Sequence, residues 1–516
     1  MNKKSVNSRA MRRYILSFIL ISVCVGALAQ THISVDNPST WTGEALRPYI
    51  NQTVVFDVPM IVCGNANGNY TVSPWRKFQP ESHGYIGTAD YNATVRVNNN
   101  CMFSISGISG YHRCGEKIIG LKVKVNSTNS LTWQGGTWSG NTRADLEKGI
   151  PDLGDYRLLV CGFNLENYYM TWGSMGADSY SEHQAQRAKI SKALKQINAD
   201  IYGLVELQQG DEAVAEIVSD LNKNLPGRQY KYFHDAATGT FQKVDYVYDA
   251  NKVEPIGQPS KTDVEVQNRK KIVCFRELAT GERFNYSINH FKAMNTGDEA
   301  RRVNEARAVV ELYNSYSGSK SVQDKDLLIM GDLNCYAYTA PIKLFMEKGL
   351  IDLHRAFHAD SSYSYMFSGL ASYIDHAITN ETMYRQVTGM AGYHINSDED
   401  DRYNYQKSSD LSMFRCSDHD PVLVGLKLDS TLVYDPSPSI NSVEILEHSL
   451  HTMTIRDAYS TESPSYYAIY TPHGDRVEMQ PITSSLQEVQ LPQTSGMYVL
   501  YIYFNGQVYQ RKFIVP

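Results

Sequence analysis

Between residues 156 and 428, apolar runs that are typical of strands alternate with segments that have a helical period. The stretch 182 to 198 carries apolar residues at i, i+4 and i+7, which indicates an amphipathic helix between two strand-like runs. Two further helices are predicted at 298 to 313 and at 341 to 348, the second closed by Gly349. This alternation predicts an α/β region in which helices cover sheets.

Polar motifs follow five of the apolar runs in this region. In chain order they are CGFNLEN at 161 to 167, YGLVEL at 202 to 207, NHFK at 289 to 292, MGDLN at 330 to 334 and CSDHDP at 416 to 421. Each places Asn, Glu, His or Asp just past a strand, where enzymes assemble metal ligands and proton-transfer groups. An isolated GDLN or SDH is more often a solvated turn. The prediction therefore rests on the whole set in one order.

The residue types in these motifs suit phosphodiester chemistry. Cleavage needs a metal ion to neutralise the phosphoryl oxygens, a group that activates water, and donors that stabilise the transition state. The motifs offer hard oxygen ligands, of the type that Mg²⁺, Mn²⁺ and Ca²⁺ prefer, at Asn164, Glu206, Asp332, Asn334 and Asp418. His290 and His419 offer proton transfer. Of the two carboxylates next to histidines, we expect Asp375 to orient His419.

A different composition precedes this region. Residues 31 to 150 are rich in Asn, Gly, Ser, Thr and Tyr, with strand-like runs at 53 to 62 and 117 to 125. This pattern predicts a small all-β domain, similar to an OB barrel. Candidates for stacking on nucleic-acid bases are its aromatic residues Tyr70, Trp75, Tyr85 and Tyr91. The more frequent alternative is that such residues belong to the core or to the ordinary surface.

The two ends of the chain have their own signatures. A basic start and an apolar stretch to Ala29 predict a signal peptide over residues 1 to 29, so we expect export. No later run is long enough for stable membrane insertion. The catalytic region, 156 to 429, is followed by a Pro-Ser linker at 430 to 439. Residues 440 to 516 lack a helical period and predict a small β-sandwich.

Charge and cysteine content bound the class of protein. The formal charge of −6 and the pI near 6.2 exclude a broadly basic nucleic-acid coat, so any nucleic acid must be gripped locally. Three cysteines lie in or beside strand-like runs and are expected to be small buried apolar residues: Cys161, Cys274 and Cys335. A single bridge is left open among Cys63, Cys101 and Cys114. No zinc-binding spacing is present.

The motifs resemble those of a known family. FNLEN, LVEL, NHFK, GDLN, YIDHAITN at 373 to 380, and SDHDP occur in the order found in the endonuclease/exonuclease/phosphatase superfamily, the fold of pancreatic-type deoxyribonuclease. KVDYVYDANKVEPIG, CSDHDPVLVGL and the stretch 395 to 405 resemble the large secreted bacterial nucleases of this superfamily. The resemblance implies a four-layer α/β sandwich of two packed mixed sheets flanked by helices. It also implies metal-dependent hydrolysis of extracellular DNA, with RNA left open.

The resemblance also assigns the metal and the water. Asn164 and Glu206 would hold the divalent metal, Mg²⁺ first, with Mn²⁺ or Ca²⁺ as alternatives, and Asp418 would join them. Asp332 and Asn334 would position the attacking water and stabilise the phosphorane.

The remaining positions concern proton transfer and phosphate. His419, oriented by Asp375, would act as a base or as a donor to phosphate, and His290 would bind phosphate and assist the leaving group. Phosphate contacts are implied for Arg269 and Lys292. The family's acidic residue before the KVxxxY strand is missing at 240 to 242, which leaves Gln242 to hydrogen-bond His290.

Other functions remain open at this stage. The same catalytic residues act on sphingomyelin or inositol phosphates in other members of the superfamily, and a surface adhesin with an inactive fold is a further alternative. The C-terminal domain resembles the sorting domains that direct Bacteroidetes proteins through the type IX secretion system. That resemblance implies the secretion machinery as a partner and a location in the medium or on the outer cell surface.

Overall fold

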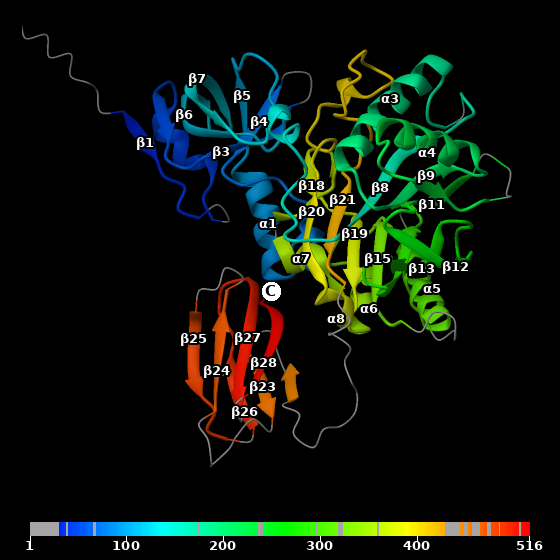
Figure 1. Cartoon of the computed structure of the whole chain (residues 1–516). Helices are drawn as coiled ribbons and strands as arrows, with labels where there is room; N and C mark the ends of the chain where they lie inside the picture. Colours follow the sequence, from blue (N-terminus) through cyan, green and yellow to red (C-terminus); the bar gives the residue numbers. More distant parts are fainter. Residues whose placement is uncertain are drawn as a thin grey trace, which may run out of the picture.

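In the computed structural model, the chain forms three parts that follow one another along the sequence (Figure 1). The described residues are 30–37, 40–65, 69–173, 175–235, 239, 241–295, 297–317, 324–358 and 361–428, followed by 444–447, 452–456, 465–471, 476–484, 486–504 and 507–515. The predicted signal peptide and linker lie outside these residues.

The N-terminal domain is built from seven strands: β1 (Thr31–Ile33), β2 (Thr53–Phe56), β3 (Met60–Gly64), β4 (Tyr70–Ser73), β5 (Phe103–Ser106), β6 (Lys117–Ser127) and β7 (Ser130–Ser139). Pairings β3–β4, β4–β5, β5–β7, β7–β6 and β6–β3 close a ring around an apolar core, and the β5–β7 pairing is parallel. The likeness to an OB barrel stays a prediction.

One element of this domain departs from the all-β prediction. The helix α1 (Ala89–Asn100) lies between β4 and β5. Thr88 caps it by accepting a hydrogen bond from the N–H of Tyr91 at 3.4 Å, and only Thr94 and Val97 of the helix are buried. Because so few apolar residues mark its buried face, the sequence of this helix shows no helical period of apolar residues.

The middle part contains two six-stranded sheets. The first runs β10 (Tyr230–Tyr232), β11 (Gln242–Asp249), β9 (Ile201–Gln208), β8 (Leu158–Tyr168), β21 (Val422–Leu426) and β20 (Val387–Gly392). The second runs β12 (Val253–Lys261), β13 (Lys270–Glu277), β14 (Arg283–His290), β15 (Leu327–Asp332), β19 (Asp375–Thr379) and β16 (Ile351–Asp352). Parallel and antiparallel pairs occur in both, so the fold is mixed α/β, as predicted.

Three apolar cores order this part into layers. One core joins the inner faces of the two sheets, and it includes Val160 of β8 and Ile288 of β14. A second joins the first sheet to α3 (Tyr180–Ile197) and α4 (Glu212–Asn224). The third joins the second sheet to α5 (Glu299–Ser317) and α6 (Ala340–Glu347). Helices therefore lie on the two outer faces (Figure 1).

Short elements complete the structure. The helix α2 (Arg143–Leu146) follows β7, and the middle part also contains α7 (Leu353–His358), α8 (Glu381–Tyr384) and the hairpin of β17 (Tyr365–Phe367) and β18 (Leu370–Ser372). The C-terminal part has a sheet of β22 (Glu444–Glu447), β23 (Thr452–Arg456) and β26 (Leu486–Gln490), and another of β25 (Arg476–Pro481), β24 (Tyr466–Tyr470), β27 (Gly496–Phe504) and β28 (Gln507–Val515). Its two sheets share one apolar core. Among the described residues, no helix is long and apolar enough to cross a membrane.

None of the seven described cysteines forms a disulfide, and all seven are buried. The bridge left open among Cys63, Cys101 and Cys114 is therefore not formed, and the Cys101 thiol donates instead to the carbonyl of Trp41 at 3.1 Å. Burial raises the pKa of the Cys101 thiol to about 11, so this thiol stays protonated at neutral pH.

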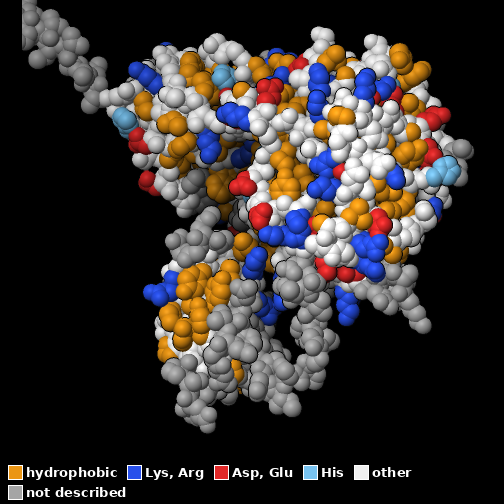
Figure 2. Space-filling model, viewed as in Figure 1, with side chains coloured by type: hydrophobic (Ala, Val, Ile, Leu, Met, Phe, Trp, Pro, Cys, Tyr) orange, Lys and Arg blue, Asp and Glu red, His pale blue; other side chains and the backbone are white. Residues whose placement is uncertain are grey.

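Surface charge agrees with the balance in the sequence. On the face shown in Figure 2, Lys and Arg side chains are scattered among Asp and Glu rather than gathered into one basic patch. Of the aromatic residues proposed for base stacking, Tyr70 is buried and its hydroxyl donates to the carbonyl of Gly110 at 2.9 Å, so it is not available. Trp75 and Tyr85 are 37% and 39% exposed.

Candidate active site

The predicted site residues come from strand ends that face one another across the two sheets. In the second sheet, His290 at the end of β14 lies beside Asp332 at the end of β15, and Asp332 pairs with Asp375 at the start of β19. From the first sheet, Asn164 of β8 donates its amide to Asp332 Oδ2 at 3.1 Å. Strand register in one sheet and contact between sheets thus bring distant motifs together.

His419 lies in the centre of this cluster. Its Nδ1 is 2.8 Å from Asp375 Oδ2, which is the pairing expected from the sequence. Its Nε2 is 3.9 Å from Asp332 Oδ2. Burial alone would lower the pKa of His419, but the nearby carboxylates of Asp375, Asp418 and Asp332 outweigh it and hold the pKa well above the usual value. The imidazole is therefore charged at neutral pH.

Two residues that the sequence did not single out complete the setting of His419. The hydroxyl of Ser364 donates to Asp375 Oδ2 at 2.7 Å, which fixes the carboxylate that faces the imidazole. The ring of Tyr365 lies 4.6 Å from the His419 ring, centroid to centroid. Both belong to the segment SSYSYMF, which carries no recognisable motif, so no sequence signal marked them.

The residues that suit a cation form two overlapping groups. In the first group, the ligand atoms of Glu206, His290 and Asp332 lie within 4.8 Å of one another. In the second group, those of Asp332, Asp375 and His419 do so. Burial, together with neighbouring carboxylates, raises the pKa of Glu206, and burial raises that of Asp332 to about 7. A divalent cation would stabilise the ionised carboxylates and so offset the free-energy cost of burying their charge. The crowded carboxylates therefore fit a hard metal ion.

The three predicted metal ligands are placed differently. Glu206 accepts the N–H of Asn167 with Oε2 at 2.9 Å, and its Oε1 faces His290 Nε2 at 3.7 Å. Asn164 uses its oxygen to accept the N–H of Glu166 at 3.0 Å. Asp418 is partly exposed, with Oδ1 3.9 Å from His419 Nε2. Glu206 therefore has the most direct access to the carboxylate cluster.

His290 is the residue for which the resemblance implies phosphate binding and assistance to the leaving group, and that role stays a prediction. It is buried, and burial together with the positive charges of Arg269 and His419 holds its pKa well below the usual value. Its Nε2 lies 3.6 Å from Asp332 Oδ2, and its Nδ1 is buried without a hydrogen-bond partner. His290 is therefore neutral here, and the missing acidic partner noted in the sequence accounts for part of this.

Gln242 does not bond the His290 ring. It accepts a hydrogen bond from the Arg269 guanidinium and donates one to Asn167 Oδ1 at 2.5 Å. Arg269, which is half-buried, is thus held beside the loop that supports Glu206. Lys292 follows two residues after His290, and its backbone N–H donates to Glu305 at 2.8 Å. Both predicted phosphate-binding residues are therefore next to strand ends of the site.

Strained backbone marks the same region. Four non-glycine residues that contact or belong to the cluster have φ in the left-handed region: Glu166 at 54°, Asn167 at 55°, Glu206 at 64° and Asn334 at 48°. A bulge in β8 shifts its register against β9 after Asn164. Such conformations persist where the surrounding structure enforces them, and they concentrate at functional sites. Asn334 directs its amide to Asp332 Oδ2 at 3.3 Å.

Gly331 explains the first letter of the GDLN motif. Its φ is 122°, and a Cβ placed there would lie 2.0 Å from the carbonyl oxygen of Asn289 on the neighbouring strand. We expect Gly331→Ala to lower the free energy of unfolding by about 3 kcal/mol, because the backbone must move at a buried strand pair. Chemical denaturation measures this. Gly227→Ala is the control, since its Cβ meets no atom within 4 Å; equal losses in both variants would contradict the argument.

Comparison with known proteins gives similarity at the level of structure. No protein-family model matches this chain, and no curated protein matches it by sequence. Solved structures similar to it include members described as endonuclease/exonuclease/phosphatase proteins, one of them from Bacteroides thetaiotaomicron, with 19% identity over 53% of this chain and 98% of that one and a TM-score of 0.38. Another is the mannosyl-6-phosphatase Bt3783 of the same organism, with 19% identity, 52% and 100% coverage and a TM-score of 0.38.

A human protein gives a similar result. The catalytic domain of human Nocturnin, solved with a bound sulfate anion, shares 14% identity over 53% of this chain and 94% of its own length, with a TM-score of 0.39. At this level of similarity, none of these proteins assigns an activity to this chain.

Proposed function

We propose that this chain is a secreted, divalent-metal-dependent nuclease that hydrolyses the phosphodiester bonds of extracellular DNA, with RNA as a further substrate to be tested. The observation that carries this proposal is the buried cluster in which charged His419, held by Asp375, faces Asp332, while His290 faces both Asp332 and Glu206. A charged donor beside carboxylates suits an anionic phosphoryl group and a water nucleophile.

The chemistry follows from the protonation states. Water attacks phosphorus, one P–O ester bond breaks, and the leaving oxygen takes up a proton from solvent, so that a phosphomonoester and an alcohol form. Asp332, once deprotonated, accepts the proton of the attacking water, and Asn334 positions that water. His419, being charged, donates a hydrogen bond to a phosphoryl oxygen, where negative charge increases in the transition state. A bound divalent metal, held by Glu206 with Asn164 and Asp418 nearby, would neutralise phosphoryl charge.

A substrate panel tests the proposal. The mature protein is incubated with single- and double-stranded DNA, RNA, sphingomyelin and inositol phosphates, each with Mg²⁺, Mn²⁺ or Ca²⁺ and with a chelator. We expect DNA to be cut with a metal present and left intact with the chelator. Cleavage of sphingomyelin or an inositol phosphate alone would overturn the nuclease assignment while keeping the hydrolytic site. No cleavage of any substrate would favour the adhesin alternative.

Metal binding can be checked without turnover. We expect Glu206→Gln to weaken Mg²⁺ binding by about tenfold or more, because a neutral amide replaces the carboxylate with the most direct access to the cluster. Isothermal titration calorimetry of the substrate-free protein measures this. Glu277→Gln provides the matched control, since Glu277 is equally a strand carboxylate but pairs with Arg157. Unchanged Mg²⁺ affinity in Glu206→Gln would remove Glu206 from the ligand set.

Export is the second component of the proposal. It is supported by the signal-like segment 1 to 29 and by the C-terminal part, whose described strands form two sheets around one core. We infer that residues 440 to 516 act as a type IX sorting domain. Deleting them in a host with that secretion system is expected to leave the enzyme in the periplasm, as measured by fractionation. Release into the medium without this domain would exclude the sorting function.

A further inference from the structure

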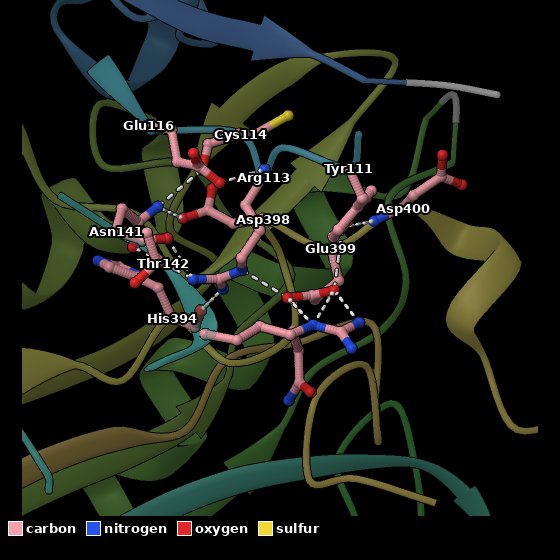
Figure 3. A network of polar contacts seen from close by, with 12 residues as sticks. Tyr111, Arg113, Cys114, Glu116, Asn141, Thr142, His394, Asp398, Glu399 and Asp400 are labelled. Atoms are coloured by element: carbon pink, nitrogen blue, oxygen red, sulfur yellow. Dashed lines mark hydrogen bonds and ion pairs between the residues drawn. The ribbon is translucent and has the colours of Figure 1, made fainter. Parts of the chain in front are cut away.

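The segment 394 to 400 lies between the N-terminal domain and the stretch that carries His419. It follows β20 in the middle part of the chain and is enclosed by side chains from the loop before β6 and the loop after β7 (Figure 3). Ile395, Asn396 and Asp398 of this segment are completely buried. Its contacts with the two sides are polar and directional, which makes its position well determined.

Several residues of the N-terminal side form ion pairs or hydrogen bonds with Asp398. The guanidinium of Arg76 forms an ion pair with Asp398 Oδ1, and the amide of Asn141 donates to Oδ2 at 2.7 Å. The N–H of Cys114 donates to the Asp398 carbonyl at 3.1 Å. The side chain of Asp398 has no exposed surface. A carboxylate this deeply buried is held only where its partners stay in place.

Glu399 is held in the same way. Arg113 Nε lies 2.5 Å from Glu399 Oε1, and the Tyr111 hydroxyl donates to Oε2 at 3.0 Å (Figure 3). Arg143 donates to both carboxylate oxygens with its Nε at 3.1 Å. Arg113 also donates to the carbonyl of His394. The Arg113 and Glu399 side chains are 1% and 0% exposed, so this ion pair is almost fully desolvated.

On its other side, the same segment fixes the backbone around His419. The amide of Asn396 donates to the His419 carbonyl at 2.6 Å, and its oxygen accepts the N–H of Cys416 at 2.9 Å. The backbone N–H groups of Asn396 and Ser397 donate to Asp420 Oδ1 at 2.8 and 2.9 Å. His419 is thus flanked on both sides by residues whose position depends on the segment.

We propose that the N-terminal domain is a positioning part of the active site, in which Arg76 and Arg113 hold segment 394 to 400 so that Asn396 keeps His419 against Asp375. This rests on the proposed function of His419. It gives the domain a second purpose besides any contact with substrate. Arg76 and Arg113 act through the segment, and neither is placed in contact with the reacting groups.

Two variants of the full chain test this inference. We expect Arg113→Met and Arg76→Met to lower kcat on a labelled DNA duplex by about 10- to 100-fold with little change in KM, as loss of an outer support for a catalytic group does. The matched control is Arg157→Met, which also breaks an ion pair with a buried carboxylate, Glu277, at the opposite end of β13 from Arg269. All are assayed well below their melting temperatures.

Conservative rescue separates positioning from general loss of stability. Arg113→Lys keeps a positive charge beside Glu399 and is expected to recover part of kcat. If Arg113→Met does not fold, Arg143→Met is used, because its side chain is 26% exposed and shares Glu399. A loss of kcat in Arg157→Met equal to that in Arg113→Met would overturn the inference, and so would a variant that lost binding alone, seen as a raised KM with unchanged kcat.

Hydrogen exchange provides a readout that needs no activity. In Arg113→Met, amides of residues 394 to 400 and of residues 415 to 420 are expected to lose protection together, while those of β13 keep it. Unchanged protection at 415 to 420 would overturn the inference. If the wild-type chain cleaves no substrate, the proposed function fails, and hydrogen exchange still decides whether the N-terminal domain holds the His419 segment.

Discussion

Replacing His419 by alanine is expected to lower kcat by about a thousandfold or more, with KM changed by much less. The imidazole is the charged donor at the centre of the site, and Asp375 holds it at 2.8 Å. Its charge is maintained by three carboxylates, so the group acts where negative charge increases in the transition state. Steady-state kinetics on a defined DNA duplex measures the loss.

His183→Ala is the matched control for this variant. His183 is likewise a buried histidine that contacts a carboxylate, Glu216 at 2.8 Å, but it lies on α3 on the outer face of the first sheet. We expect its kcat to stay within a few-fold of wild type. A decrease of only a few-fold in His419→Ala would remove His419 from the mechanism, whatever the fate of the control.

Asp332→Asn is expected to lower kcat by a similar factor, about a thousandfold. The Asp332 carboxylate lies within 4 Å of both His290 and His419, and Asn164 and Asn334 both direct amides to it. Asparagine keeps the size of the side chain but cannot accept the proton of the attacking water. A variant that retained near-normal turnover would assign the proton-accepting function to another group.

The same substitution is expected to stabilise the metal-free protein at neutral and higher pH. Burial raises the pKa of Asp332 from 3.8 to about 7, so the folded state binds this proton more tightly than the unfolded chain does. The stability that Asp332 contributes is present below its unfolded pKa and is lost as pH rises through about 7. The asparagine variant has no such loss.

Thermal melts in the presence of a chelator test the sign of this pH dependence of stability. The melting temperature of Asp332→Asn minus that of wild type should increase between about pH 5 and about pH 8, because only the wild-type protein must desolvate a charge as pH rises. Saturating Mg²⁺ should reduce the difference, since the ion compensates the wild-type carboxylate. A difference that stayed constant across this range would show that Asp332 is ionised throughout in the metal-free protein.

The residues that the sequence predicted for the site lie close together in the structure because their motifs border strands, and their catalytic functions stay predictions. His290, Asp332 and Asp375 are register partners in one sheet, and Asn164 and Glu206 lie on parallel neighbours in the other. In each case an apolar run marked the strand, and polar residues marked its end or, for Asp375, its start. The strand-to-helix alternation likewise predicted α3, α5 and α6 to within a few residues.

Several contacts between individual side chains of distant segments could not be predicted from the sequence. Ser364 supports Asp375 from a loop that has no motif, and Asn396 supports His419 from the stretch 395 to 405, whose resemblance assigned a function to none of its residues. Gln242 forms a hydrogen bond with Arg269 instead of His290, because the register of β11 against β9 determines where its side chain lies. Such pairings depend on how two sheets and a neighbouring domain are placed, and local sequence does not encode that placement.

The absence of disulfides among the described residues has a practical meaning for a protein proposed to act outside the cell. Because all seven cysteines in the described part of the chain are buried and form no disulfide, its fold does not depend on an oxidising compartment or on a disulfide isomerase. Recombinant enzyme should therefore mature in a reducing cytosol and keep its activity in dithiothreitol. An enzyme of this kind would tolerate surroundings whose redox potential varies.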